Sequence, residues 1–245
     1  MNEIVTFNDV EISDFFLVAG VSRPLTGRRN VTQEVSGMRG VKVTGSNLSE
    51  NTVSVFLVIK DKEGSEKREA IRDLVCAIQV DEPSRLYISS DDGLYYMAIP
   101  DGEVPFTEHF RSGLVEVKFL VSDPVMYGAT HTATIPSGGS VGIYVDGTYP
   151  TKPRIESQAA LGMQDTTLWG LRFDEADYIR AITGSSSVAK TVEIDSEARV
   201  CRVAGAISLP SIDSDWPELG AGMHVVRNDV GTGESTITWT DRWVS

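Results

Sequence analysis

Apolar and polar side chains alternate in short runs along most of this chain, which is the pattern of half-buried β-strands. The clearest run places Val53, Val55, Leu57 and Ile59 on one face. Similar runs recur in both halves of the chain, and Asp92–Gly93 between two of them is a tight hairpin signal. The period-two pattern therefore predicts a mostly β fold.

One segment, residues 65–80, departs from this pattern and repeats its apolar residues at helical spacing. These apolar residues are Ala70, Ile71, Leu74, Val75 and Ile78. Lys67 and other polar residues lie on the opposite face, Ser65 is placed to cap the first turn, and Pro83 follows the end. The spacing predicts one amphipathic helix packed on a sheet.

The stretch VEVKFLVSDPVMYG, residues 115–128, is a strand with an abrupt end. Pro124 cannot donate a hydrogen bond to a central β-ladder. After Gly128 the chain becomes rich in Gly, Pro, Ser and Thr, and short strands then recur at regular spacing, as in an antiparallel sandwich. We therefore predict two domains, residues 1–130 and 131–245, with the boundary near 129–136.

Residues 22–39, SRPLTGRRNVTQEVSGMR, lack a strong period and carry Arg28 and Arg29 at their centre. A long loop of this kind inside a compact domain is unusual and often functional. One interpretation is an extended arm that reaches another subunit. The alternative is an irregular surface loop with no special role.

The sequence contains no recognisable catalytic or metal-binding pattern. The three histidines have no partner at metal-ligand spacing, and no nucleophile elbow or dinucleotide fingerprint is present. The glycine-rich stretch 136–142 precedes no helix, so it lacks the usual setting for a phosphate site. Asp213 with Asp215, and the carboxylates near Asp174, lie in turn-rich stretches. We expect no catalytic residue, no cofactor and no metal.

Charge and hydropathy exclude two further classes. The chain carries 22 basic and 35 acidic residues, a net charge of −13, and the acidity is spread through both halves. Such a chain repels polyanions, so sequence-specific binding to nucleic acid is not expected. No apolar run is long enough to cross a bilayer, and the N-terminus lacks the pattern of a signal peptide, so no membrane insertion is expected.

Four tryptophans lie in the second half, namely Trp169, Trp216, Trp239 and Trp243. Aromatic rings on a β-sandwich can stack on sugars, but large aromatics more often fill a core or an interface. The alternating strand around Trp239 favours a core position. Trp216, beside a proline in a loop, is the best of the four for sugar stacking.

The order of these segments resembles the distal tail protein (Dit) family of long-tailed siphophages and related prophages. In the first half the resemblance rests on VSRPLTGRRN, VSVFLVIK, REAIRDLVCAI and, most closely, GLVEVKFLVSDPVMYG. In the second half it rests on VDGTYPTKPRIE, TVEIDSEARV, SDWPELGAGMHVV and TITWTDRWV. One departure is the segment 221–224, Ala-Gly-Met-His, where the family often has Pro-Gly-x-Asn.

The resemblance implies a virion structural protein and not an enzyme. Members of this family form a hexameric ring at the tip of the tail, with a β-sandwich or barrel-like ring domain and an outward, galectin-like β-sandwich. The implied partners are other copies of the chain, the tail tube protein, a tail-tip protein (a tail-associated lysin or a fibre) and a receptor-binding protein. The chain would lie in the virion after assembly in the host cytoplasm, in a short form without an inserted carbohydrate-binding module.

The resemblance also suggests roles for particular residues. Arg28, Arg29 and Asn30 would belong to the inter-subunit arm. Asp123, Pro124 and Tyr127 would form the seam between the two domains, as hinge and packing residues. The competing interpretation is a carbohydrate-binding protein that recognises host wall sugars through its second domain, with an enzyme a distant third.

Overall fold

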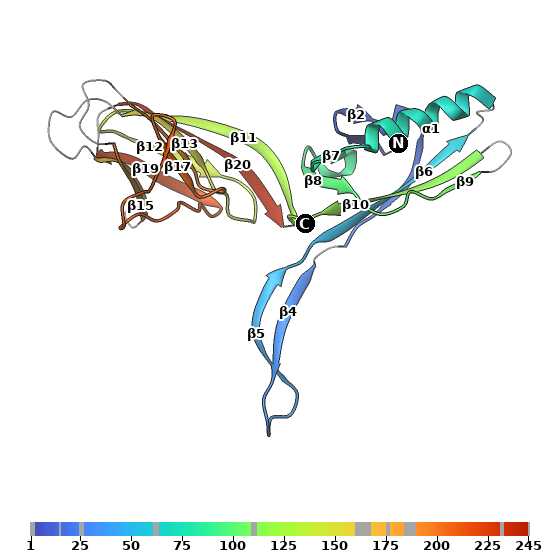
Figure 1. Ribbon diagram of the computed structural model, residues 1–245, viewed down its shortest axis with the longest axis horizontal. Coiled ribbons are helices and arrows are strands. Elements are labelled where there is room, and N and C mark those ends of the chain that lie inside the picture. The colour runs from blue at the N-terminus through green and yellow to red at the C-terminus, as the bar shows by residue number, and fades with distance from the viewer. Residues whose placement is uncertain are drawn as a thin grey trace. The chain divides into compact units, whose positions relative to one another are not determined.

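The computed structural model divides the chain into two compact units, described separately below (Figure 1). Unit 1 comprises Met1–Tyr127 with Val244–Ser245, and unit 2 comprises Gly128–Trp243. The domain boundary predicted at residue 130 lies close to this division. The structure describes residues 3–14, 16–24, 27–60, 64–108, 112–159, 168–174, 177–183, 190–230 and 233–244.

Unit 1 is an antiparallel β-structure with one α-helix. Its sheet order is β11-β8-β10-β6-β3, with β7 and β9 paired to β8 and β10, β1 paired to β7, and β2 to β1. Strands are β1 (Val5–Phe7), β2 (Val10–Glu11), β3 (Leu17–Ser22), β4 (Arg28–Glu34), β5 (Val41–Leu48), β6 (Asn51–Lys60), β7 (Ser84–Ile88), β8 (Tyr95–Pro100), β9 (Phe106–Glu108), β10 (Ser112–Val121) and β11 (Val125–Ile135). Helices are η1 (Ile12–Asp14), α1 (Gly64–Ile78) and η2 (Ser89–Asp91).

The predicted alternation of buried and outward side chains along the two central strands is confirmed. In the pairing of β10 with β6, Val117 lies opposite Val55 and Phe119 opposite Val53, so the apolar faces of both strands coincide. All four side chains are buried in the first core. The hairpin predicted at Asp92 joins β7 to β8, and both Asp92 and the glycine after it have positive φ.

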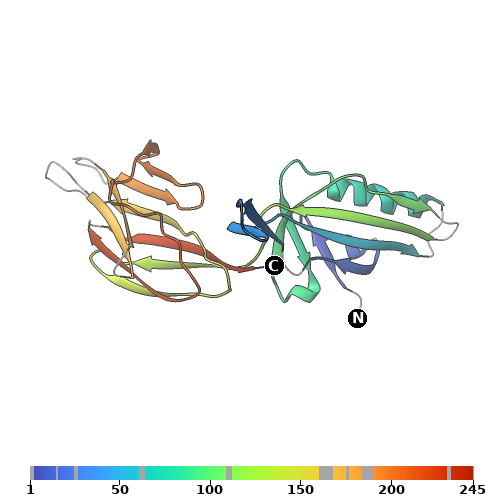
Figure 2. The ribbon, with the colours of Figure 1, turned by 90° about the horizontal axis from the view of Figure 1, so that it is seen from below.

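Helix α1 lies along the sheet that contains β6 and β10 (Figure 2). Its buried side chains include Ala70 and Leu74, as predicted, but two assignments from periodicity are wrong. Val75 is 49% exposed, whereas Lys67 is buried and donates from Nζ to the Ser112 carbonyl (3.1 Å). Lys67 faces the sheet because a carbonyl there accepts its charge-assisted hydrogen bond.

Both ends of α1 also differ from the prediction. The helix begins at Gly64, so Ser65 lies within its first turn and does not precede it as a cap. It ends at Ile78, two residues before the predicted end at residue 80.

Unit 2 is a sandwich of two antiparallel sheets. One has the order β18-β17-β16-β13-β20-β11, and the other has the order β12-β19-β14-β15. The strands are β12 (Ser140–Val145), β13 (Arg154–Ala159), β14 (Leu168–Phe173), β15 (Asp177–Ile182), β16 (Lys190–Asp195), β17 (Val200–Val203), β18 (Ala206–Ser208), β19 (Gly222–Val230) and β20 (Ser235–Val244). The predicted fold class, mostly β with one helix and a C-terminal sandwich, is confirmed.

The inner faces of the two sheets form the second core. β14 contributes Trp169 and Leu171, β16 contributes Val192 and Ile194, and Trp239 comes from β20. The predicted core position of Trp239 is therefore confirmed. In the four-stranded sheet, side chains alternate between this core and the outward face, apart from a register shift between Gly170 and Arg172 where β14 pairs with β19.

Candidate assembly surfaces

The segment around Arg28 forms a β-hairpin, which we call the arm, comprising β4 and β5, residues 28–48 (Figure 1). The interpretation of residues 22–39 as an irregular stretch is thus wrong, because residues 28–34 pair with 41–48. Alternation was hidden in β4 because its side chains are mostly polar on both faces. Among the described strands, β4 and β5 pair only with each other.

The arm exposes valines on both of its faces. Val31 lies opposite Gly45 and Val43 lies opposite Thr32, with a register shift between the two pairs. Because Val31 and Thr32 are consecutive on β4, Val31 and Val43 point to opposite sides of the ribbon. Val31 is 52% exposed and Val43 is 57% exposed. A two-stranded hairpin is marginally stable in water unless its faces are packed against something else.

The charge of the arm is opposite to that of the chain. Residues 28–48 carry four basic side chains and a single acidic one, Glu34, whereas acidic residues exceed basic ones by 13 in the whole chain. Arg28, Arg29 and Asn30 are all exposed and lie opposite Leu48, Asn47 and Ser46. The structure therefore places the three predicted arm residues together on one strand, and their contact with a neighbouring subunit stays a prediction.

Polar contacts hold the two segments that flank the arm. Arg23, just after β3, forms an ion pair with Asp91 at the end of η2. Burial and the Asp91 carboxylate raise the pKa of Tyr96, and Arg23 opposes that shift. Ser49 N–H donates to the Gly27 carbonyl (3.0 Å), which closes the ribbon where it leaves the sheet.

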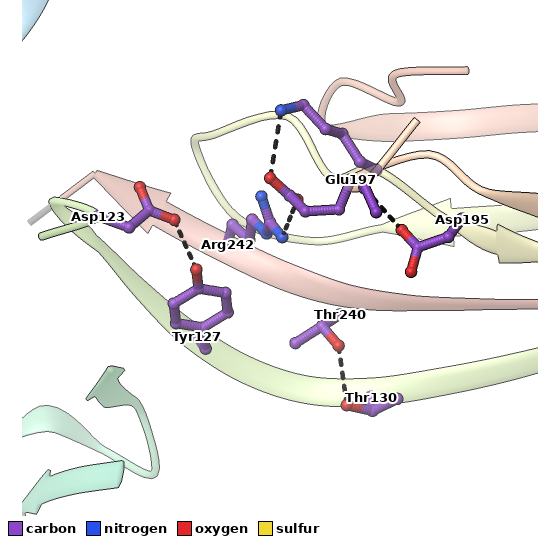
Figure 3. A network of polar contacts seen from close by, with 9 residues as sticks. Asp123, Tyr127, Thr130, Asp195, Glu197, Thr240 and Arg242 are labelled. Atoms are coloured by element: carbon purple, nitrogen blue, oxygen red, sulfur yellow. Dashed lines mark hydrogen bonds and ion pairs between the residues drawn. The ribbon is translucent and has the colours of Figure 1, made fainter. Parts of the chain in front are cut away.

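The predicted seam residues form a compact turn between β10 and β11. The Val125 N–H donates to the Asp123 carbonyl (2.7 Å), and the Tyr127 hydroxyl donates to the Asp123 carboxylate (2.5 Å; Figure 3). The Tyr127 ring stacks on Tyr95 with centroids 5.7 Å apart. Asp123 and Tyr127 thus come together, and their role as a domain seam stays a prediction.

The break between strands at Asp123–Pro124 is shorter than the sequence indicated. Only residues 122–124 interrupt the strands, and β11 then runs through the boundary at Tyr127 and Gly128. Proline fits at this position because a bend requires no ladder hydrogen bond from it.

A second polar network in unit 2 joins β20 to the segments before β13 and after β16. Arg242 of β20 donates from Nη2 to Glu197 Oε2 (2.7 Å), and Lys152 Nζ lies 3.3 Å from Glu197 Oε1 (Figure 3). Partial burial works to raise the pKa of Glu197, but the hydrogen bond and charge of Arg242, with a smaller contribution from Lys152, lower it below its ordinary value of 4.5.

Glu197→Gln is expected to lower the stability of unit 2 at neutral pH but not in acid. Because the pKa of Glu197 is depressed in the folded state, its carboxylate contributes stability above pH 4.5, and this contribution is lost as pH falls below that value. Glu197 is half exposed, so we expect a loss of less than about 1 kcal/mol. Urea unfolding followed by tryptophan fluorescence at pH 7 and pH 3 measures the difference.

The matched control for that experiment is Glu156→Gln, which removes an exposed carboxylate 3.2 Å from Arg154. We expect almost no change from it at either pH. A Glu197→Gln deficit that is the same at pH 7 and pH 3 would contradict the account.

Other sequence-predicted features acquire no new role. Trp216 is half-buried and packs against the second core, so sugar stacking through it stays a prediction. Among the described residues, no group of three or more potential metal ligands occurs. Within the same part of the chain, the helices are all too short or too polar to span a membrane.

Sequence reasoning missed the apolar character of the arm and the composition of one sheet face. The alternation of Val41 and Val43 was visible, but no local sequence pattern indicated that this strand would pair only with the polar segment before it. Likewise, Arg172 and Arg227 lie on separate strands, and only the register of the sheet sets them opposite each other.

Comparison with known proteins covers both halves of the chain. A family model described as the phage tail protein RIFT-related domain matches residues 10–121, and one described as the siphovirus-type tail component, C-terminal domain, matches residues 146–243. No curated protein matches the chain significantly.

Solved structures share the fold at low sequence identity. The crystal structure of Dit from phage SPP1, described as a paradigm of the hub adsorption apparatus in phages that infect Gram-positive hosts, has a TM-score of 0.78 at 16% identity and covers 99% of each chain. Two structures of the phage p2 baseplate in its activated conformation, with Sr and with Ca, each have a TM-score of 0.50 at 11% identity over 97% of each chain. Two successive matches to siphophage tail models and one fold shared over its whole length lead to the same result: the chain belongs to the siphophage distal tail (Dit) family.

Proposed function

We propose that this chain is a structural hub protein of a siphophage baseplate, and that six copies close into a ring at the tip of the tail. The observation that carries the ring is the arm, a paired ribbon that exposes valines on both faces. Family membership and the full-length likeness to SPP1 Dit support the hub role.

Docking of the arm on a neighbouring copy would cover the valines that the isolated chain leaves exposed. Because Val31 and Val43 are about half exposed, covering each one contributes roughly 1 kcal/mol, and both faces of the ribbon offer such side chains. The basic arm and the acidic remainder of the chain attract each other, which favours docking on a second copy over other acceptors.

The geometry of the contact suits a ring. The arm and its acceptor are different surfaces, so the interface is heterologous, and heterologous contacts close into rings when the rotation between copies permits. β3 lies at the end of its sheet order and offers a strand edge for the same interface.

A hub of this kind joins the tail tube to a tail-tip protein and to receptor-binding proteins, and leaves a channel for DNA. An acidic chain suits such a channel because negative walls discourage DNA from adhering. The virion tail tip is therefore the proposed location, after assembly in the host cytoplasm.

The mass of the chain in solution tests the ring. We expect a hexamer for the wild type, measured by sedimentation or mass photometry over a wide range of concentration. The double variant Arg28→Glu/Arg29→Glu should shift the chain toward monomers, because it reverses the charge of the arm where β4 begins.

A matched control carries the same change of charge elsewhere in unit 1. Arg68 and Arg72 are exposed on α1, and Arg68→Glu/Arg72→Glu should leave the oligomer intact. A wild-type chain that stays monomeric at every concentration would count against the ring. An unchanged hexamer in the Arg28→Glu/Arg29→Glu variant would remove these arginines from the interface.

A further inference from the structure

The four-stranded sheet of unit 2 has an outward face with the composition of a protein-binding surface. The register of β12, β19, β14 and β15 sets Tyr144 opposite Met223 on one side of the sheet. Met223 is 68% exposed and Tyr144 is 59% exposed, and both point away from the core. Tyrosine, methionine and arginine are the residue types enriched at protein interfaces.

Arginines occupy the centre of this outward face. Arg227 of β19 lies directly opposite Arg172 of β14, and Arg172 in turn lies opposite Tyr178 of β15.

Arg180 completes the group and is held in place by its surroundings. Its guanidinium lies 4.2 Å from the centroid of the Tyr178 ring. Gly170 lies opposite Arg180, and a Cβ at Gly170 would come within 2.6 Å of the Arg180 Cγ, so the arginine lies against the bare glycine backbone. Stacking on an aromatic ring orders a guanidinium in advance and reduces the entropy lost on binding.

We propose that this surface, the arginine face (Arg172, Tyr178, Arg180, Arg227, Met223 and Tyr144), binds an acidic patch on another protein of the virion. That the partner is a virion protein rests on the proposed hub function. Guanidinium groups bind carboxylates through paired hydrogen bonds, and Arg180 and Arg227 on one sheet fit a pair of Asp or Glu side chains.

A protein suits this face better than an anionic polymer does. The arginines are flanked by exposed apolar side chains, which a sugar or phosphate chain would leave in water, whereas a folded partner would cover them. In the segment next to β15, Ser211 N–H donates to the Arg180 carbonyl (2.8 Å). The following residue, Ile212, is 98% exposed, and the exposed carboxylates Asp213 and Asp215 follow it.

Binding of the purified tail-tip and receptor-binding proteins of the same phage tests the inference, with the full-length chain immobilised. We expect at least one of them to bind, with an affinity that weakens as salt is raised. Arg180→Glu and Arg227→Glu should each weaken that affinity about tenfold or more. Gly170→Ala should weaken it too, because the added methyl group displaces Arg180 from its position.

The control is Arg202→Glu on β17, an exposed arginine of the other sheet, which should leave the affinity unchanged. Failure of both proteins to bind, or equal binding by Arg180→Glu, Arg227→Glu and wild type, would overturn the proposal. Binding of polyphosphate that is lost in the same variants, without any effect on the protein partners, would also overturn it.

The outcome is separable from that of the ring. The oligomeric state of Arg180→Glu and Arg227→Glu should equal that of the wild type, since the arm belongs to unit 1. A chain that fails to form a ring yet binds its partner through these arginines would overturn the hexamer and leave the arginine face intact.

Discussion

Gly147→Ala is expected to destabilise unit 2 by about 3 kcal/mol or more. Gly147 has a φ of +107°, a conformation that side chains with a Cβ rarely adopt. A Cβ at this position would lie 2.0 Å from the Arg242 carbonyl oxygen, which is backbone of β20 and cannot move aside. Strain and overlap therefore act together.

The Arg242 carbonyl also explains why the backbone at Gly147 passes so close to β20. Thr148 N–H (2.9 Å) and Tyr149 N–H (3.0 Å) both donate to Arg242 O, so the DGTYP turn is fastened to the last strand. Any side chain at Gly147 separates these groups. Urea or thermal unfolding measures the loss, and tryptophan fluorescence reports on unit 2 alone because all four tryptophans lie there. We expect a drop in Tm of roughly 10 °C.

Gly205→Ala separates the two causes. Gly205 also has a positive φ, +79°, but nothing lies within 4 Å of a Cβ placed there. It should cost about 1 kcal/mol, from backbone strain alone. Equal losses for Gly147→Ala and Gly205→Ala would show that the close approach to Arg242 adds nothing.

The core of the fold could be predicted because its signals are local. Val53 and Val117 each stand between two polar neighbours, and that alternation alone assigns them to the buried face. The helix was located for the same reason. Lys67 could not be placed, because the carbonyl of Ser112 that accepts its hydrogen bond comes from a strand far along the chain.

The candidate surfaces were predictable only in part. The pair Arg28–Arg29 in a stretch without apolar period pointed to an arm, yet its hairpin needed the pairing of two segments that are polar on most positions. The arginine face depends on register: Arg172 and Arg227 are separated by a long stretch of chain, and no local pattern relates them. Long-range pairing is the information that periodicity lacks.

Val31→Asp and Val43→Asp are each expected to abolish the ring while unit 1 stays folded. Both side chains are about half exposed in the single chain, so the substitutions alter the surface and spare the core. In the proposed ring each valine is covered by the neighbouring copy, and an aspartate there would bury an unpaired carboxylate. A loss of about 3 kcal/mol at every interface corresponds to more than a hundredfold weaker contact.

The two variants test different faces of the ribbon, and their comparison locates the acceptor. Loss of the hexamer in both means that the neighbour covers the arm on two sides, whereas loss in only one assigns the contact to that face. Val75→Asp, an equally exposed valine on α1, is the control and should leave the mass unchanged. If Val75→Asp breaks the ring and both arm variants keep it, the contact lies on the helix, and the arm has no part in assembly.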